Sequence, residues 1–247
     1  MSGHSKWATI RRAKGATDAK RGALFTRLGR EVMVAAKEGG GNPDSNIRLR
    51  LAIEKARAGN MPKDNIQRAI DRATGVGADG VVYEEITYEG YLPHKVPALI
   101  HVMTDNKNRT AADVRKILTR SGGALGEGAS VAWQFERKGY IVIERTDKVD
   151  ADTVFEIAAE AGADDIQTSD EVVEIYTSVD SFRAVRDALT AKGYALASAE
   201  VSMIPTTQTS LNKEETEKVL EIIDALEEMD DVQDVYHNLE VSEEVAA

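Results

Sequence analysis

The chain contains 247 residues, 42% of them hydrophobic and 30% charged, a composition that fits a globular protein of two or three domains. No run of about 18 apolar residues predicts a membrane span, and the N-terminus lacks the apolar core of a signal peptide. The sequence has no cysteine, which excludes disulfides, thiolate metal sites and cysteine nucleophiles, so we expect a cytoplasmic protein.

The net charge of −11 is unevenly distributed along the chain. Residues 1–80 contain 16 Lys/Arg and 8 Asp/Glu, a net charge of +8, whereas the remaining residues contain 15 and 34, a net charge of −19. Such asymmetry is typical of a protein whose basic part binds a polyanion. In residues 1–30 alone, eight cations stand against one acid. The sequence therefore predicts a nucleic-acid-binding segment at the N-terminus.

Residues 1–20 combine positive charge with little apolar periodicity, which predicts a flexible or weakly helical arm. Lysine and arginine neutralise phosphates and release counterions, and an indole can stack on a base. The alternative, a solvated basic helix, is less favoured because charge of one sign is dense here. Phe25 is interpreted as a core residue. The predicted nucleic-acid contacts are the cations of this segment and one aromatic residue: Lys6, Trp7, Arg11, Arg12, Lys14, Lys20, Arg21, Arg27 and Arg30.

Apolar spacing predicts three helices, which make residues 1–75 a small helical domain. In the first, apolar residues recur about every 3.6 positions from Leu24 until Gly39–Gly41 ends the helix. Asn42 followed by Pro43 is typical of an N-cap and first helical position, so the second helix is expected to begin there. Pro62 begins the third. The predicted inward residues are Leu24, Leu28, Val32, Ala35, Ala36, Ile47, Leu51, Ile53, Ala56, Ile66, Ala69, Ile70 and Ala73.

The second and third helices are joined by a short turn with a glycine, as in helix-turn-helix units. Polar side chains of the third helix, namely Asn65, Gln67, Arg68 and Arg72, would then read base edges in the major groove. Many three-helix bundles share this spacing. We therefore favour contacts to the phosphate backbone and keep base reading as the alternative.

The segment Gly75–Gly80 matches the dinucleotide-binding pattern G-x-G-x-x-G. That pattern works only between a strand and a helix, where the helix N-terminus meets the pyrophosphate. Here a predicted helix precedes the glycines and a predicted strand follows them. We interpret the segment as a linker.

After the linker the pattern changes to α+β. Strands are predicted at 82–91 and 96–104, a helix from Thr110 to about residue 121, and two short strands at 131–135 and 139–145. Helices at 151–162 and 181–192 alternate with strands at 164–168, 171–177 and 195–203. From residue 139 this order is β-α-β-β-α-β, the ferredoxin-like arrangement.

A last helix after Asn212 and a strand at 232–241 have no sheet of their own. Because the ferredoxin-like unit is already complete, we expect the strand to pair within the 81–104 region. The third domain would then be inserted into the second. The predicted domains are a basic helical domain at 1–80, a discontinuous α+β domain at 81–131 and 205–247, and a ferredoxin-like domain at 132–204.

A second group of polar residues stands at a predicted helix start, where helix N-termini favour anions. A phosphate contact and a turn held by asparagine side chains are equally supported there. The residues are Asn106, Lys107, Asn108 and Arg109.

Several ordered motifs give the chain a resemblance over nearly its whole length. They include Gly3-His4-Ser5-Lys6-Trp7, Tyr88-Glu89-Gly90-Tyr91 and the run from Thr104 to Thr110, followed by Ala199–Pro205 and Asp231–Asn238. Together they resemble the YebC family of probable transcriptional regulatory proteins, which is related to the mitochondrial translational activator of cytochrome c oxidase subunit I.

The resemblance implies three domains with the third inserted in the second, nucleic-acid binding and no enzymatic activity. It implies either a DNA-binding transcriptional regulator or a ribosome-associated translation factor that relieves stalling at proline runs. The partners would be DNA or ribosomal RNA and the ribosome. One loop departs from the family pattern, since Leu92-Pro93-His94-Lys95 stands where Gly-Pro-Gly-Gly is usual.

An enzyme is the competing class. The four histidines show no metal-binding spacing, and neither a nucleophile elbow nor a phosphate-binding loop is present. The acidic pairs Asp164-Asp165 and Asp230-Asp231 are interpreted as solvated ends of elements. Small-molecule sensing by the ferredoxin-like domain would rest on fold analogy alone. We therefore predict no catalytic residues, no cofactor, no metal, no small-molecule substrate and no membrane partner.

Overall fold

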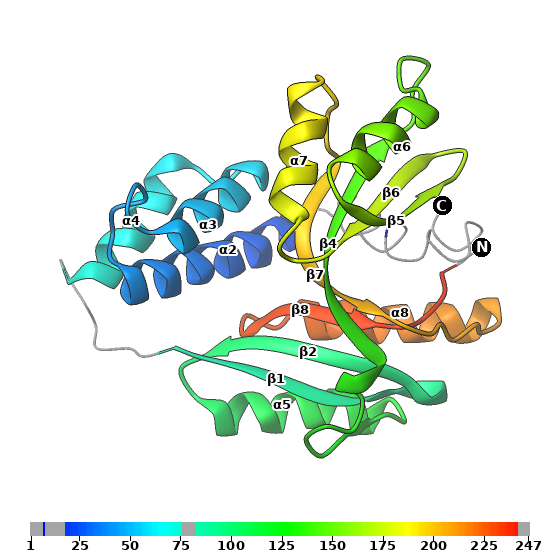
Figure 1. Ribbon diagram of the computed structural model, residues 1–247. Helices are drawn as coiled ribbons and strands as arrows, with labels where there is room; N and C mark the ends of the chain where they lie inside the picture. The colour runs from blue at the N-terminus through cyan, green and yellow to red at the C-terminus, as the bar shows by residue number, and fades with distance from the viewer. Residues whose placement is uncertain (1–6, 8–17, 76–82, 242–247) are drawn as a thin grey trace. The chain divides into compact units, whose positions relative to one another are not determined.

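The computed structural model describes Trp7, residues 18–75 and residues 83–241 (Figure 1). The chain forms two compact units. One consists of Met1–Ala13, Ala132–Lys213 and Asn238–Ala247, and the other of Lys14–Val131 and Glu214–His237. The domain boundaries predicted at residues 80, 131 and 204 remain a proposal.

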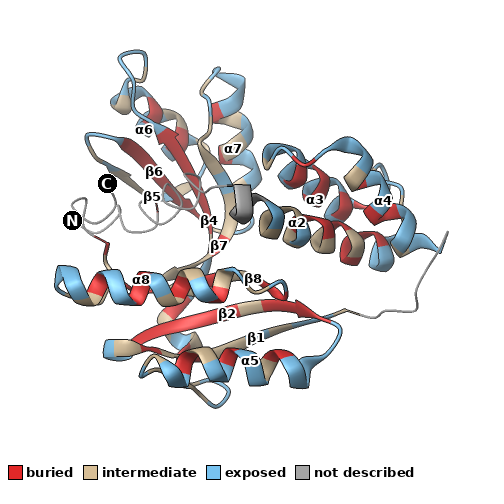
Figure 2. Ribbon diagram, turned by 180° about the vertical axis from the view of Figure 1, so that it is seen from behind, coloured by how far each residue is buried: buried red, intermediate tan, exposed pale blue. Residues whose placement is uncertain are grey.

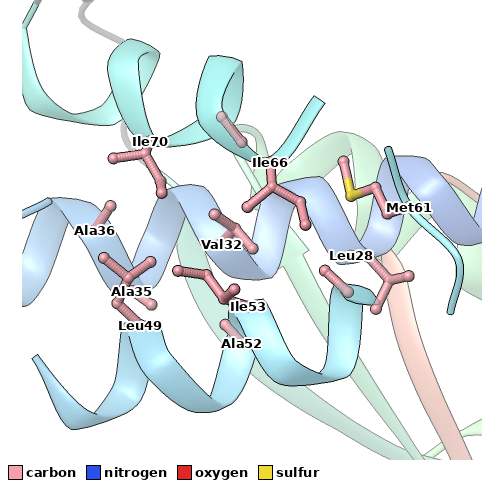
Figure 3. Packing of buried hydrophobic residues seen from close by; sticks show 12 residues of the cluster. Leu28, Val32, Ala35, Ala36, Leu49, Ala52, Ile53, Met61, Ile66 and Ile70 are labelled. Carbon is pink, nitrogen blue, oxygen red and sulfur yellow. The ribbon is translucent and has the colours of Figure 1, made fainter. Parts of the chain in front are cut away.

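Three helices make the N-terminal part of the second unit: α2 (Asp18–Gly39), α3 (Ile47–Ala58) and α4 (Lys63–Thr74). Figure 3 shows α2 running between the other two, with side chains from both sides meeting on it. The predicted inward residues of α2 and α4 are confirmed, and Phe25 packs against the same core. The buried residues of this core are Leu28, Val32, Ala35, Ala36, Leu49, Ala52, Ile53, Ala56, Met61, Ile66, Ala69 and Ile70.

The start and the inward face of α3 differ from the prediction. Residues 43–45 form a turn, and the N-cap is Asn46, whose side chain accepts a hydrogen bond from the backbone N–H of Leu49 at 3.0 Å. Its amide group also donates to the carbonyl of Ala35 at 2.7 Å. This later start turns the helix, so Ile47 and Leu51 are 67% and 49% exposed instead of buried.

The second unit continues with a four-stranded sheet in the order β3-β1-β2-β8. The last strand pairs antiparallel with β2, and Val235 lies opposite Ile100. The predicted pairing of the C-terminal strand with the 81–104 region is confirmed, so the chain leaves this sheet and returns to it. The elements are β1 (Glu84–Leu92), η1 (Pro93–Lys95), β2 (Val96–Thr104), α5 (Lys107–Arg120), β3 (Ala124–Leu125), α8 (Lys213–Glu227) and β8 (Val232–His237).

Between these segments the chain builds a second antiparallel sheet, in the order β5-β6-β4-β7. The ferredoxin-like fold class is thereby confirmed. Where two short strands were expected at 131–145, a 3-10 turn, η2 (Ala132–Gln134), leads into one ten-residue strand. The elements are β4 (Phe135–Glu144), α6 (Ala151–Glu160), β5 (Ala163–Thr168), β6 (Val172–Thr177), α7 (Phe182–Ala191) and β7 (Ser198–Pro205).

The core of this sheet lies between its strands and the two helices. Ile141 and Ile143 of β4 and Val173 and Ile175 of β6 are buried against apolar residues of α6 and α7. Figure 2 shows the buried stretches along β4 and β6 and on one side of each helix. Successive residues of a strand point to opposite faces, so the intervening residues of β4 and β6 lie on the other face of the sheet.

The hairpin turn between β1 and β2 is built on two left-handed residues that are not glycine. His94 and Lys95 have φ angles of 60° and 62°. Glycine adopts this conformation without the Cβ clash that raises the energy of other residues. The glycines usual at this loop in the resembling family therefore match the backbone that this chain also adopts.

Lys95→Gly is expected to raise the free energy of unfolding by about 0.5–1 kcal/mol, because relief of the left-handed strain outweighs the larger backbone entropy of glycine in the unfolded chain. Urea unfolding would measure the difference. Lys192→Gly is the matched control, since Lys192 is exposed with a φ of −83° and the same change there should be destabilising. A Lys95→Gly variant less stable than the parent would contradict the strain argument.

Candidate nucleic-acid interface

The centre of the predicted interface falls mainly outside the described residues. Lys6, Arg11, Arg12 and Lys14 belong to that part of the chain, so their contacts with nucleic acid stay a prediction. Lys20 and Arg21 lie in the first turn of α2, and Arg27 follows on the same helix, half-buried. The described part of the candidate interface therefore consists of the residues next to the arm and their partners.

Trp7 has a different environment from the one predicted. Its side chain is 5% exposed and belongs to an apolar cluster with Tyr140, Val142, Val172 and Tyr176 of the ferredoxin-like sheet. A buried indole offers no face to a base. Stacking of Trp7 on nucleic acid therefore stays a prediction, and it would require the indole to leave this cluster.

Arg30 is also occupied within the protein. Its guanidinium Nη1 donates hydrogen bonds to the carbonyls of Met103 at 2.8 Å and Asp230 at 2.6 Å, and to Asp231 Oδ1 at 2.8 Å. The group also lies 5.1 Å from the ring centroid of Tyr83, within cation–π range. With 11% of its side chain exposed, Arg30 ties α2 to the β-sheet of its own unit and does not present its charge to a phosphate.

Asp231 is the acceptor on which this part of the structure converges. Its Oδ1 atom pairs with Arg30, and its Oδ2 atom accepts from the hydroxyls of Thr104 at 3.1 Å and Thr110 at 2.6 Å and from Arg109 Nη2 at 2.8 Å. Its side chain is 10% exposed. The carboxylate was expected to be a solvated end of a strand, and that interpretation is wrong, because four side-chain donors surround it.

We call Asp231 and its four donors, Arg30, Thr104, Arg109 and Thr110, the Asp231 cluster. The electrostatics of this cluster favour the ionised carboxylate. Burial by itself raises the pKa of Asp231, but hydrogen bonds from Thr110 and Arg109 and the charges of Arg30 and Arg109 outweigh it, so the pKa is lowered. The pKa of Arg109 is raised by its hydrogen bonds to Asp231 and Asp105. These charges stabilise each other inside the protein.

The second predicted phosphate site follows the structural alternative. Asn106 is the N-cap of α5, and its side chain accepts from the backbone N–H of Arg109 at 3.1 Å, so the helix begins three residues before the predicted start. Arg109 pairs with two carboxylates, and Lys107 lies 3.8 Å from Glu84. Asn108 is exposed. Because internal carboxylates balance both cations, a phosphate contact here loses its main support.

Cations on α3 are largely paired as well. Arg48 contacts both Glu38 and Glu85, and Lys55 Nζ lies 3.0 Å from Glu31. Arg50 donates to the carbonyls of Pro43 at 3.1 Å and Asp44 at 2.9 Å. Most of the positive charge named on this helix is thus engaged in contacts within the protein and does not form a free basic patch.

Three of the four α4 side chains considered for base reading bond within their own helix, and the fourth, Arg72, is exposed. Gln67 donates to Asp71 at 2.8 Å, and Arg68 bonds to the carbonyl of Asp64 at 3.2 Å and to Asn65. Two aspartates share this exposed face, which repels phosphates. Moreover, α3 and α4 meet across α2 instead of packing as a helix-turn-helix pair (Figure 3). The geometry gives no support to major-groove reading.

Two further kinds of feature, a metal site and a membrane span, are not found in the part of the chain that the structure describes. No group of three or more His, Asp or Glu side chains there is placed to hold a metal ion. None of the described helices combines the length and apolar character needed to cross a membrane.

Comparisons with known proteins agree with this architecture. Residues 5–76 match the TACO1/YebC protein N-terminal domain, and residues 83–239 match the TACO1/YebC second and third domain. A probable transcriptional regulatory protein of Trichlorobacter lovleyi is 54% identical over 98% of this chain and 97% of its own length, and one from Geobacillus kaustophilus is 54% identical over 98% of both chains. The crystal structure of a conserved hypothetical protein from Aquifex aeolicus superposes with a TM-score of 0.81 at 41% identity, covering 94% of this chain and 95% of that one. The chain belongs to the TACO1/YebC family.

Proposed function

We propose that this protein is a cytoplasmic regulator of gene expression that binds nucleic acid through its basic N-terminal segment, as a DNA-binding regulator of transcription. The observation that carries the proposal is the density of positive charge before and within α2. Arg30 is used internally, which leaves seven cations against one acid in residues 1–30. The names of relatives that share about half of the sequence support a regulatory role.

The mode of binding follows from which cations remain available. Contacts from an arm without a recognition helix go mainly to phosphates, and the affinity comes from released counterions. Of the α4 side chains that would read bases, Gln67 and Arg68 bond within the helix. We therefore propose binding that depends on the backbone and tolerates different sequences.

This preference for the backbone also favours a second candidate, a translation factor that acts on the ribosome and relieves stalling at proline runs. Ribosomal RNA presents dense phosphates on a folded surface, and recognition there depends on shape and backbone contacts. A protein that binds mainly through backbone contacts fits such a surface as well as it fits a duplex.

Measuring binding to unrelated DNA duplexes and co-sedimentation with ribosomes from the same cell, both at physiological salt, tests the two candidates together. A transcriptional regulator should bind duplex DNA tightly and should not co-sediment with the ribosomes. A translation factor should bind duplexes weakly and without preference, yet remain with ribosomes. Absence of both interactions in a folded preparation would overturn the proposed function.

A further inference from the structure

The ferredoxin-like sheet has one face that its own helices do not cover. On β4 and β6, alternation places Tyr140, Val142, Val172 and Tyr176 opposite the face that packs on α6 and α7. The rings of Tyr140 and Tyr176 lie 5.3 Å apart between centroids. We call these four residues the aromatic face. Such an apolar face needs a cover, because exposed aromatic surface is costly in water.

Part of this cover comes from the other end of the sequence. Trp7 packs on the aromatic face with 5% of its side chain exposed. Glu174 is fully buried on the same face, where its carboxylate accepts a hydrogen bond from the Tyr140 hydroxyl. Burial and then the charge of Glu174 raise the pKa of Tyr140, so the hydroxyl stays a donor. A tryptophan of the basic arm thus packs on a face that also holds a buried acidic side chain.

The charges of the two partners are opposite. Residues 132–213 contain 8 basic and 15 acidic side chains, a net charge of −7. The arm segment in the same compact unit, Met1–Ala13, contains three Lys/Arg and no Asp/Glu. Apolar burial of Trp7 and attraction between opposite charges therefore act in the same direction.

We propose that the aromatic face is a docking site for the chain's own N-terminal arm, and that docking competes with nucleic-acid binding. This inference rests on the proposed function. Lys6 directly precedes Trp7 in the sequence. Residues 132–213, which include the face on which Trp7 docks, carry a net charge of −7, and at a Debye length of about 8 Å this charge opposes the approach of a phosphate to the docked arm. By linkage, nucleic acid that binds the undocked arm better must draw Trp7 away from the aromatic face.

The fluorescence of Trp7 tests the docking directly. The chain has two tryptophans, and Trp133 is 73% exposed, so Trp133→Phe leaves Trp7 as the only indole at small structural cost. In the free protein its emission should be blue-shifted and poorly quenched by acrylamide. Addition of a DNA duplex or of ribosomal RNA should shift the emission to the red and increase quenching. Red, freely quenched emission before any nucleic acid is added would overturn the docking site.

Tyr176→Ala tests the competition without changing the arm. It should increase the affinity for the same duplex or RNA about three- to tenfold, since the apparent affinity rises as the fraction of undocked arms rises. Phe155→Ala, which removes an aromatic ring that is 53% exposed on α6 of the same unit, should leave the affinity unchanged. Circular dichroism confirms that each variant is folded.

The outcomes separate the two hypotheses. Weaker or unchanged binding by folded Tyr176→Ala, or nucleic-acid binding while Trp7 stays buried, would overturn the competition and leave the proposed function standing. If neither the parent nor any variant binds nucleic acid, the proposed function fails and the competition fails with it. Blue emission of Trp7 in the free protein would still support the docking site in that case.

Discussion

Replacing Asp231 by alanine is expected to lower the free energy of unfolding at pH 7 by about 3 kcal/mol, because removing one partner of a buried ion pair leaves the other charge uncompensated. The uncompensated group is Arg30, of which 11% is exposed and which keeps only backbone acceptors. The hydroxyls of Thr104 and Thr110 lose the same acceptor. Denaturant unfolding measures the loss.

Asp230→Ala is the matched control, since that neighbouring side chain is exposed and only its backbone carbonyl contacts Arg30. It should change stability by less than about 0.5 kcal/mol. Equal effects of the two variants would show that the Asp231 cluster does not hold the unit together.

Lowering the pH should remove the contribution of Asp231 to the free energy of unfolding. The pKa of this carboxyl is lower in the folded protein than the value of about 3.9 in an unfolded chain. Its contribution is therefore fully present above pH of about 4 and is lost as the pH falls through the folded pKa. Unfolding measured between pH 7 and pH 2 should show the parent and Asp231→Ala converging only at the acid end. A constant difference over this range would contradict the assignment.

The elements that could be predicted from the sequence are those whose pattern is local. The apolar period of α2 and α4 places residues on one face whatever the rest of the chain does. The insertion of the ferredoxin-like fold also followed from the order of the elements. The start of α3 did not, because Asn42 and Asn46 are both good caps in the sequence. Only Asn46 also reaches the carbonyl of Ala35, eleven residues away.

The candidate interface was harder to predict because a sequence shows charges without their partners. In the sequence, Arg30 and Arg109 both look available to bind a phosphate. In the structure both pair with Asp231, which lies 201 and 122 positions further along the chain. Asp231 itself carried a local signal, an acid directly before a strand that starts at Val232. Such residues are usually solvated, so only the fold distinguishes this one. Trp7 is the same case, since its apolar partners start at Tyr140.

Replacing Arg11, Arg12 and Lys14 together by alanine is expected to weaken nucleic-acid binding on the order of 100-fold at about 0.15 M salt, if each cation contacts one phosphate. The reason is the loss of released counterions. The slope of the logarithm of affinity against the logarithm of salt concentration should then fall by up to about 3. Fluorescence anisotropy of labelled duplexes and RNA, measured over a range of salt, gives both quantities.

The control must remove as much charge without touching the arm. Lys148, Arg183 and Lys192 are exposed cations of the ferredoxin-like fold, and replacing all three by alanine changes the net charge equally. Their loss should weaken binding less than about threefold and leave the slope unchanged, because a change in the overall field adds no released counterion. A control that weakens binding as much as the arm variant would show that net charge, and not the arm, is responsible.

Gln67 and Arg68 distinguish backbone contacts from base reading. Both already bond within α4, so replacing them by alanine should leave the affinity for unrelated sequences nearly unchanged. A base-reading helix would behave differently, since each lost base contact costs about 1–3 kcal/mol and only at the preferred site. A duplex preferred about a thousandfold over random DNA, with the preference abolished by these two substitutions alone, would reverse the assignment. The dependence of affinity on salt concentration decides between the two mechanisms even when the affinities are similar. Contacts to the neutral edges of bases release no counterions, whereas contacts to phosphates do.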